Sequence, residues 1–269
     1  MSVIRSPDNP RVKAWARLAE EPRERRKRGL ALIEGVHLVE TFLARRGSPK
    51  RLLVSEAALG KREISGLVER SCLAPVVLEE AIFKRISDAE TPSGIAAEIT
   101  IPDEQIDLSA SRGCVFLEGL QDAGNVGTIL RSAAAFGIGD VIVGRGCADP
   151  WSPKALRAGM GGHFFLRIAA SASLAEDVRR FGDVSICTVA HGGAPLDAMD
   201  LRGRVGWIFG SEAAGASAEV AAAASCRATI VTPGGAESLN VAASAAICFY
   251  ERERQRQLND RINTRGARS

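Results

Sequence analysis

The sequence predicts an α/β protein in two parts. From Gly113 onward, short apolar runs typical of strands alternate with segments of helical periodicity, and the first hundred residues show a looser alternation of the same kind. Such alternation favours a mostly parallel sheet that binds ligands at the loops leaving the carboxyl ends of its strands. A polar stretch separates the parts, so we predict an N-terminal domain over 1–101, a linker over 102–112 and a second domain over 113–269.

Each predicted helix or strand is based on the periodicity of its apolar residues and on the residues at its two ends. In the first domain, Trp15 and Leu18 lie on one helical face, as do Val36, Val39 and Phe42. We predict helices over 12–18 and 35–46, and strands over 30–33, 51–55, 76–78 and 94–101. In the second domain we predict strands over 114–117, 140–144, 184–189, 205–209 and 228–231, and helices over 126–136, 153–159, 217–224 and from Asn240 onward.

Composition and length fit a globular protein. The 269 residues are 46% hydrophobic and 25% charged, and no apolar run reaches the roughly 18 to 20 residues that a spanning helix needs. The N-terminus lacks a signal-peptide hydrophobic stretch, so we expect a cytoplasmic protein with no membrane contact. The six cysteines form no CxxC pair and have no histidine at zinc-ligand spacing, so we expect reduced core cysteines and no metal.

Charge is unevenly distributed. Residues 1–30 carry nine Arg or Lys against four Asp or Glu, and residues 251–269 carry six Arg against three Asp or Glu. The residues between these two segments are therefore net acidic, although the net charge of the whole chain is +3. This favours contact with a polyanion at the ends or through a few arginines of the body. The run Arg23–Arg28 can equally be the solvated face of a helix.

Familiar phosphate-binding and hydrolase motifs are missing. The sequence contains neither GxxxxGK[ST] nor a GxGxxG that follows a strand, and its three histidines stand in no HExxH or GxSxG context. P-loop enzymes, Rossmann dehydrogenases, zincins and triad hydrolases are therefore disfavoured.

The loop after strand 114–117 carries unusual polar residues. Asn125 stands where a helix N-cap is expected, and Arg131 follows within the helix. Small residues flank Arg131 at helical spacing, Gly127 before it and Ala134 and Ala135 after it, and leave room around the guanidinium. An exposed surface arginine on an alanine-rich helix is the alternative.

Two further loops leave predicted strands. Gly210–Gly215 is a turn of small residues around one carboxylate, Glu212, which suits close approach to a ligand but also suits an ordinary strand-to-helix turn. In Thr232–Val241, Pro233 ends the strand, and Ser238 or Asn240 can cap the last helix or contact a ligand.

In this order the three loops resemble the motifs of the SpoU/TrmH family of RNA ribose 2′-O-methyltransferases, within the SPOUT superfamily. The matches are N-x-G-x-x-x-R with A-x-F-G over 125–137, F-G-S-E-x-x-G over 209–215, and P with E-S-L-N-V over 233–241. The resemblance covers about residues 113–254. One departure is Asp122-Ala123-Gly124, where members often carry Asp-Pro. The N-terminal part resembles a ribosomal-protein-like substrate-binding domain, with Ile33-Glu34-Gly35 and Thr91–Ile95 as its signatures.

The resemblance implies a parallel sheet with a C-terminal deep trefoil knot, S-adenosylmethionine as cofactor, and homodimers with substrate sites at the subunit interface. Cofactor would be held largely by backbone groups of 188–192, 208–215 and 230–240, which explains the missing Rossmann glycines. The implied cofactor-binding residues are Val189, Ala190, Gly210, Ser211, Glu212, Gly215, Ile230, Thr232, Pro233, Ser238, Leu239 and Asn240.

The implied catalytic residues are Arg131, Asn125, Glu212, Ser238 and Asn240. Arg131 acts either as an electrostatic stabiliser of the developing alkoxide or, as the family is often described, as a general base; the guanidinium is a poor base, which favours the first role. Asn125 would orient the target ribose or Arg131, and Glu212 would hold the first loop or Arg131. Ser238 and Asn240 would complete the pocket.

The resemblance makes RNA the partner. We expect large-subunit ribosomal RNA as substrate, with transfer RNA as the alternative, and RNA contact by the basic run of Arg23, Arg25, Arg26, Lys27 and Arg28. Two interpretations from other classes stay open, namely a non-catalytic RNA-binding or ribosome-assembly protein and a nucleotide-dependent α/β enzyme.

Overall fold

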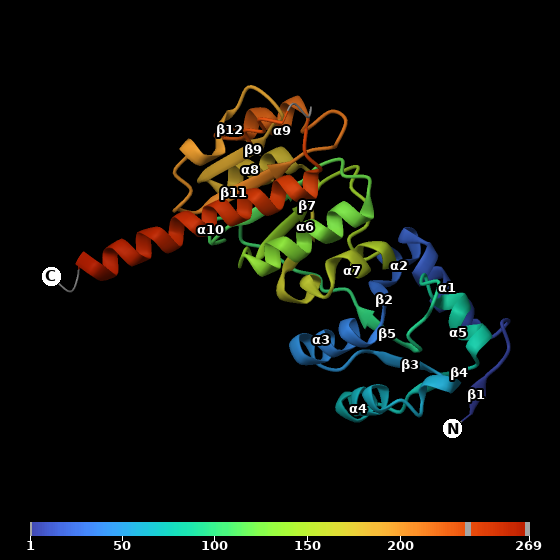
Figure 1. Cartoon of the computed structure of the whole chain (residues 1–269). Helices are drawn as coiled ribbons and strands as arrows, with labels where there is room; N and C mark the ends of the chain where they lie inside the picture. Colours follow the sequence, from blue (N-terminus) through green and yellow to red (C-terminus); the bar gives the residue numbers. More distant parts are fainter. Residues whose placement is uncertain (1, 235–237, 267–269) are drawn as a thin grey trace. The chain divides into compact units, whose positions relative to one another are not determined.

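The chain divides into two compact units. A computed structural model describes residues 2–234 and 238–266, with only the backbone described over 260–266. One unit consists of Met1–Asp103 with Asp149–Phe165, and the other of Glu104–Ala148 with Leu166–Ser269 (Figure 1). Residues 149–165 therefore pack with the N-terminal elements, although the sequence pattern had grouped them with the second domain.

The first unit is built on a five-stranded mixed sheet in the order β1-β4-β3-β5-β2, in which β5 runs antiparallel to both of its neighbours. Its strands are β1 (Val3–Ile4), β2 (Leu30–Glu34), β3 (Arg51–Ser55), β4 (Val76–Leu78) and β5 (Ile95–Thr100). Its helices are α1 (Pro10–Glu20), α2 (Pro22–Arg28), α3 (Val36–Arg46), α4 (Arg62–Ser71), α5 (Glu80–Ile86) and α7 (Pro153–Gly159), with short 3₁₀ turns at Glu56–Ala58 and Gly162–Phe165.

Alternation along the strands sorts the core of this unit onto two faces. One face carries Leu32, Leu53 and Ala96, which pack against α1 and α5 (Figure 1). On the same face, buried Glu98 accepts hydrogen bonds from Trp15 Nε1 at 2.6 Å and from Arg51 at 2.5 Å. A buried carboxylate in an apolar layer needs such partners. The bond from the Trp15 indole therefore fixes α1 to the inner strand β5.

A buried ion pair ties residues 149–165 to α2. Arg25 is 2% exposed and donates to Asp149 Oδ2 at 2.6 Å, and it also donates to the carbonyl oxygens of Leu18 and Ala19. The sequence had placed Arg25 in an exposed RNA-binding run. Its burial corrects this assignment, because a guanidinium enclosed by three protein acceptors is not free to meet RNA.

The same segment buries a histidine beside Trp151. His163 is fully buried, and its Nε2 lies 2.8 Å from the carbonyl oxygen of Pro150. Burial lowers the pKa of His163 to about 4, so the imidazole is neutral at physiological pH.

The second unit is a seven-stranded sheet in the order β10-β12-β9-β11-β6-β7-β8, and every pairing in it is parallel. Its strands are β6 (Cys114–Leu117), β7 (Asp140–Val143), β8 (Arg167–Ala170), β9 (Val184–Thr188), β10 (Ala194–Pro195), β11 (Val205–Phe209) and β12 (Cys226–Thr229). Its helices are α6 (Ala123–Ala135), α8 (Leu174–Phe181), α9 (Ala218–Ala223) and α10 (Val241–Gly266), with a 3₁₀ turn at Leu196–Ala198.

Helices cover both faces of this sheet. On one face α8 and α9 contact each other, and Phe116, Ile208 and Val178 share their core. On the other face α6 packs against α10, and the ring of Phe249 meets those of Trp207 and Phe209 edge to face. The predicted parallel α/β architecture is confirmed, whereas β8 and α8 were missed because 167–181 is short and highly charged.

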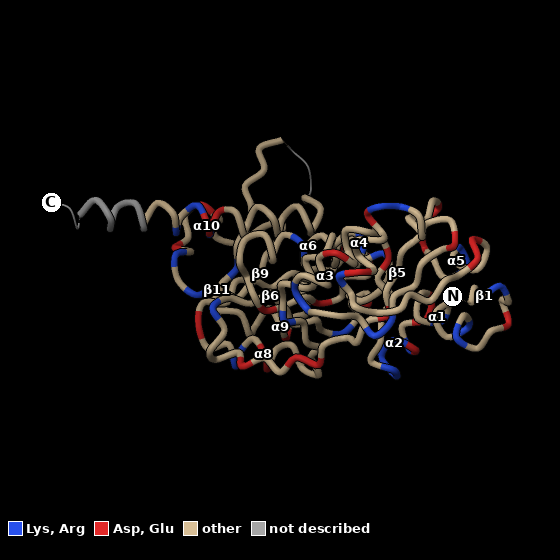
Figure 2. Tube along the Cα trace, turned by 90° about the horizontal axis from the view of Figure 1, so that it is seen from below, with Lys and Arg blue, Asp and Glu red and all other residues tan. Residues whose placement is uncertain are grey.

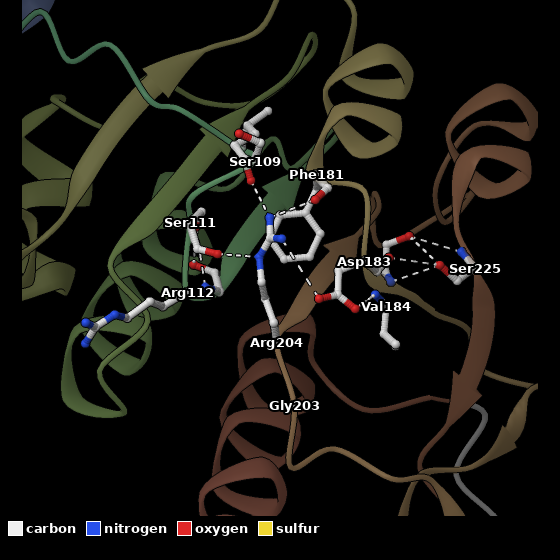
Figure 3. Close-up of polar contacts among 12 residues, drawn as sticks. Ser109, Ser111, Arg112, Phe181, Asp183, Val184, Gly203, Arg204 and Ser225 are labelled. Carbon is white, nitrogen blue, oxygen red and sulfur yellow. Dashed lines mark hydrogen bonds and ion pairs between the residues drawn. The ribbon is translucent and has the colours of Figure 1, made fainter.

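One arginine, Arg204, binds the predicted linker over 102–112. The Arg204 guanidinium donates to the carbonyl oxygens of Ser111, Leu108 and Phe181, stacks on the Phe181 ring at 4.2 Å and lies 3.9 Å from Asp183 (Figure 3). Satisfying three backbone acceptors at once anchors the stretch before β6 to the end of α8. The segment from Glu104 onward therefore belongs to the second unit.

The cysteines follow the expectation in part. All six are free thiols, and Cys114, Cys187 and Cys248 are buried, but Cys72 is exposed. Cys72 adopts a left-handed backbone conformation at the end of α4, with φ of 55°, which explains its place outside the core. Among the described residues no helix is long and apolar enough to cross a membrane.

The Arg25–Asp149 pair makes a testable prediction. Arg25→Ala leaves a buried carboxylate without its cation, so we expect the free energy of unfolding to fall by about 3 to 5 kcal/mol in denaturant titrations. The matched control is Arg26→Ala on the same helix, because Arg26 is exposed and we expect a change within about 0.5 kcal/mol. Equal effects of the two substitutions would contradict the buried-pair assignment.

Candidate active site

Three neighbouring strands open onto one cavity. The cavity measures about 730 Å³ and is lined by residues that follow the carboxyl ends of β9, β11 and β12 and by the first turns of α10. Parallel sheets bind ligands at this edge, and the volume is that of a small-molecule site. Of the residues predicted to bind cofactor, the lining includes Val189, Ala190, Gly210, Ser211, Glu212, Gly215, Ile230, Thr232, Ser238, Leu239 and Asn240.

The loop after β11 is a closed turn. Ser211 and Gly215 exchange two backbone hydrogen bonds of 3.0 and 2.9 Å, which leaves Glu212 at the exposed tip. Gly210 is buried beneath this turn, where an added Cβ would lie 1.9 Å from the backbone nitrogen of Ala216. Only glycine allows the strand to meet its own turn so closely.

A carboxylate that sequence reasoning missed anchors the far side of this loop. Glu118, directly after β6, accepts from the Ser217 backbone N–H at 2.7 Å and from the Ser217 hydroxyl at 2.9 Å. Ser217 in turn caps α9 by accepting from Val220 N–H. An acidic residue at the carboxyl end of a central strand was the available signal, and it was overlooked beside the more distinctive Asn125.

The three sequence loops meet through one carboxamide. Asn125 donates from Nδ2 to Glu212 Oε1 at 2.7 Å and accepts at Oδ1 from Asn240 Nδ2 at 3.0 Å. The two bonds fix the orientation of the amide, since its donor and its acceptor are both engaged. Asn240 also caps α10 by accepting from the N–H groups of Ala242 and Ala243, as its position before the helix predicted.

The N-cap of α6 differs from the expectation. Asp122 occupies the cap and accepts from the N–H groups of Gly124 and Asn125, so Asn125 lies inside the first turn. This placement frees the Asn125 side chain for its contacts with the other two loops.

Arg131 lies elsewhere on the same helix. Its side chain is exposed, it is not among the residues that line the cavity, and Glu212 binds Asn125 instead of Arg131. Gly127 is buried one turn before Arg131, and Ala134 and Ala135 follow one turn after it on the same helix.

The third loop is described in part. Ser238 and Leu239 line the cavity, while Pro233 lies in an exposed turn and is not among the lining residues. Glu237, which belongs to the predicted motif, lies outside the described residues.

The described lining of the cavity carries one carboxylate and no cationic side chain. It holds Glu212 and His191 and, among the described residues, no Lys or Arg. Burial raises the pKa of the Cys248 thiol to about 12, so this cysteine is neutral and unsuited to act as a nucleophile. His191 lies in the predicted segment 188–192, whereas Ser244 and Cys248 were not anticipated, although Ser244 follows Asn240 at the i+4 spacing that would have placed it here.

A site with this composition suits a ligand without phosphate groups. Phosphates call for cations or for the N–H groups of a glycine-rich loop at a helix start. Among the residues that the structure describes, no Lys or Arg lines this cavity. No group of three potential metal ligands occurs among the described side chains, which are those of residues 2–234 and 238–259.

Comparison with known proteins decides the family. The model of the SpoU rRNA Methylase family matches residues 113–250, more than half of the chain. The chain belongs to the SpoU rRNA methylase family. The model of an MRM3-like substrate binding domain matches residues 9–97, in agreement with the predicted N-terminal substrate-binding domain.

Relatives of this SpoU protein are RNA methyltransferases. It is 33% identical over 252 residues to the Bacillus subtilis 23S rRNA (guanosine(2553)-2′-O)-methyltransferase RlmP, covering 93% of this chain and 98% of the relative. A solved RNA 2′-O ribose methyltransferase aligns with a TM-score of 0.79 at 32% identity, covering 95% of this chain and all of the other. The SpoU methyltransferase AviRb from Streptomyces viridochromogenes, solved with AdoMet, aligns with a TM-score of 0.81 at 25% identity, covering 92% and 99%.

These findings confirm the predicted family, its SPOUT-type parallel α/β fold and an RNA 2′-O-methyltransferase activity at the level of the family. Members of this SpoU family are dependent on S-adenosylmethionine. The motif order along the chain was therefore a sufficient signal, even though each loop alone had an ordinary structural explanation.

The turn after β11 in this SpoU protein gives a prediction. In Gly210→Ala the new methyl group overlaps backbone atoms of Gly215 and Ala216, so the turn that presents Glu212 must shift. We expect a fall in Tm and a loss of S-adenosylmethionine binding by at least about tenfold in calorimetry, since a displaced turn loses several contacts.

The matched control is Gly203→Ala, where no atom lies within 4 Å of the added Cβ. We expect wild-type Tm and binding for this variant. Unchanged binding by Gly210→Ala would show that the turn does not shape the ligand site.

Proposed function

We propose that the protein transfers a methyl group from S-adenosylmethionine to a ribose 2′-hydroxyl of ribosomal RNA of the large subunit. The observation that carries the proposal is the Glu212–Asn125–Asn240 chain, which joins the three family motifs beside a cavity whose described lining holds no Lys or Arg. The 23S rRNA specificity named for the Bacillus subtilis relative supports the choice of substrate.

The residues of the cavity fit S-adenosylmethionine. The cofactor carries a nucleoside and an amino acid but no phosphate, and the lining has small residues, exposed backbone and one carboxylate in place of a phosphate loop. We propose that Val189, Ala190, Ile230, Thr232 and Leu239 hold it, together with the turn from Gly210 to Gly215 and with Pro233, Ser238 and Asn240. When bound, the sulfonium supplies an activated methyl group.

The chain's own residues must then make a weakly acidic hydroxyl nucleophilic. We propose that Arg131 stabilises the developing alkoxide and positions the adjacent phosphate, because a guanidinium stays protonated and is a poor proton acceptor. Asn125 and Glu212 act as positioning residues: the two hydrogen bonds of the Asn125 carboxamide set where the first loop stands relative to the cavity.

The proposed site is completed by a second copy of the chain. Arg131 does not line the cavity of its own subunit, and α10 exposes an apolar stripe that includes Ile247 at 39% and Tyr250 at 58%. The Tyr250 ring meets Phe136 of α6 edge to face, so the stripe continues toward the helix that carries Arg131. A homodimer through α6 and α10 would cover this surface and bring an arginine to a neighbouring cavity.

We further propose that the C-terminal segment threads a deep trefoil knot. The strand order supports it: after β9 the chain places β11 on one side of β9 and β12 on the other, and then returns to pack α10 against α6. Threading of the chain through one of its earlier loops would account for this order.

The central test is methyl transfer with labelled S-adenosylmethionine to separated rRNA and tRNA, followed by mapping of resistance to alkaline cleavage. We expect label in large-subunit rRNA at a ribose 2′-oxygen. For Arg131→Ala we expect kcat to fall at least about a hundredfold, because an oxyanion-stabilising group is lost, while cofactor affinity stays unchanged.

The control for this experiment is Arg179→Ala, an exposed arginine on the opposite face of the sheet, which we expect to keep wild-type activity. Label in tRNA alone would overturn the choice of substrate. Cofactor binding without transfer to any RNA would favour a non-catalytic RNA-binding protein.

The basic run makes a second prediction about RNA. Arg23, Arg26 and Lys27 are exposed on α2, whose Lys and Arg residues Figure 2 marks in blue, whereas Arg28 is paired with Glu24 at 2.9 Å. Replacing the first three by alanine should weaken RNA binding and lower the slope of log affinity against log salt by about 2 to 3, as expected for three lost phosphate contacts.

Cofactor affinity of this triple variant should be unchanged in calorimetry, which separates RNA contact from damage to the site. A wild-type salt slope would assign these three residues to the solvated surface of α2.

A further inference from the structure

The first unit has a small cavity of its own. It measures about 130 Å³ and lies between the end of β2, the start of α3, the loop after α5 and helix α7. Glu34 and Gly35 line one side, and Thr91 and Ser93 line another. These residues belong to the two N-terminal signatures, Ile33–Gly35 and Thr91–Ile95, which the proposed methyl transfer leaves unexplained.

The walls of the cavity are apolar and its rim is polar. Leu32, Leu38, Ile86 and Leu156 are buried and line it. At the rim the Glu34 carboxylate accepts from the Ser87 hydroxyl at 2.7 and 2.8 Å. The Asp88 backbone N–H is a second donor to this carboxylate. A carboxylate has about four acceptor sites, so lone pairs stay available to a ligand.

A second carboxylate and a cation lie beside the first. Asp88 forms an ion pair of 2.8 Å with Arg157 of α7, and both residues line the cavity. The rim therefore combines hydrogen-bond acceptors with one guanidinium. Burial raises the pKa of Glu34, which shows that this carboxylate is partly withdrawn from water.

The size of the cavity limits the ligand to about one ring. An apolar cavity of about 150 Å³ in another protein accepts benzene, and 130 Å³ is close to that size. A purine, with two fused rings, exceeds it, whereas a pyrimidine base matches the volume and can pack its faces against the apolar walls.

The family match points to RNA as the source of such a ring. The region matched by the substrate-binding domain, residues 9–97, contains every lining residue except those of α7. Proteins read single-stranded RNA by taking unstacked bases into contact with side chains and hydrogen-bonding their edges. Carboxylates accept from the exocyclic amino group of cytosine, which uracil lacks.

We propose that this cavity binds one unstacked pyrimidine base of the RNA substrate and prefers cytosine to uracil. The ring lies between Leu38, Ile86 and Leu156, Glu34 accepts from the amino group, and Arg157 faces the polar edge. The inference rests on the proposed RNA substrate and adds a base-reading site in the first unit to the methyl-transfer site in the second.

The test uses the full chain with ¹³C-labelled Leu and Ile methyl groups and titrates it with cytidine, uridine and adenosine 5′-monophosphates. We expect saturable shifts of the Leu38, Ile86 and Leu156 methyl signals with the cytidine nucleotide, at millimolar affinity. The uridine nucleotide should bind about tenfold more weakly, as expected for the loss of one hydrogen bond to a charged group. The adenosine nucleotide should leave these signals in place.

Two variants locate the binding. In Ala89→Phe the new phenyl ring occupies the cavity, so this variant should abolish the methyl shifts caused by the cytidine nucleotide. Ala81→Phe, at an exposed position of α5, should leave these shifts intact. Glu34→Gln keeps the size of the side chain and should lower the preference for cytosine over uracil. Its methyl spectrum without ligand reports whether the fold is kept.

No methyl shift with the cytidine nucleotide would overturn the proposal, as would shifts that persist in Ala89→Phe or equal shifts with adenosine. Because the titration needs neither methyl donor nor RNA turnover, its failure is distinguishable from a failure of the proposed methyl transfer. The two outcomes are independent: a protein that methylates no RNA can still bind the cytidine nucleotide in this cavity, and an active methyltransferase can lack this binding.

Discussion

The Asn125 carboxamide is the junction on which the site depends. Its two hydrogen bonds reach Glu212 and Asn240, which lie 87 and 115 positions away in the sequence. Each partner stands on a loop that leaves a different strand, so a single planar amide sets the spacing of three loops. Because one bond uses its donor and the other its acceptor, a rotated amide would face like atoms on both sides.

The absence of Lys and Arg from the described lining of the cavity fits the cofactor on which this SpoU family depends. Nucleotide enzymes use glycine-rich loops and cations to hold phosphate groups, and this sequence carries neither a P-loop nor a Rossmann glycine motif. In this protein Gly210, directly after β11, lets the chain pass closely beneath the turn that follows it. Hydrogen bonds between Ser217 and Glu118, which follows β6, hold that turn to the centre of the sheet.

Sequence alone predicted the family, the parallel sheet and most of the cavity lining, because each of these depends on residues that are close together in the sequence. At Arg25 and at the N-cap of α6 the sequence-based prediction failed because contacts between distant residues decide the structure. Arg25 has the same local surroundings as Arg26, and only Asp149, 124 positions away, makes it a buried residue. Asp122 and Asn125 are both good N-caps three residues apart, and the contacts of Asn125 with the other loops decide between them.

The segment from Asp149 to Phe165 has a consequence for how the protein can be divided. The chain crosses from the first unit to the second after Asp103, returns after Ala148 and leaves again after Phe165. Removing the N-terminal hundred residues would therefore take Phe42 away from Phe164 and the walls of the first unit's cavity away from Leu156. Each unit consists of two stretches of chain joined to the other unit by covalent connections, so neither can be cloned as one uninterrupted stretch of the gene.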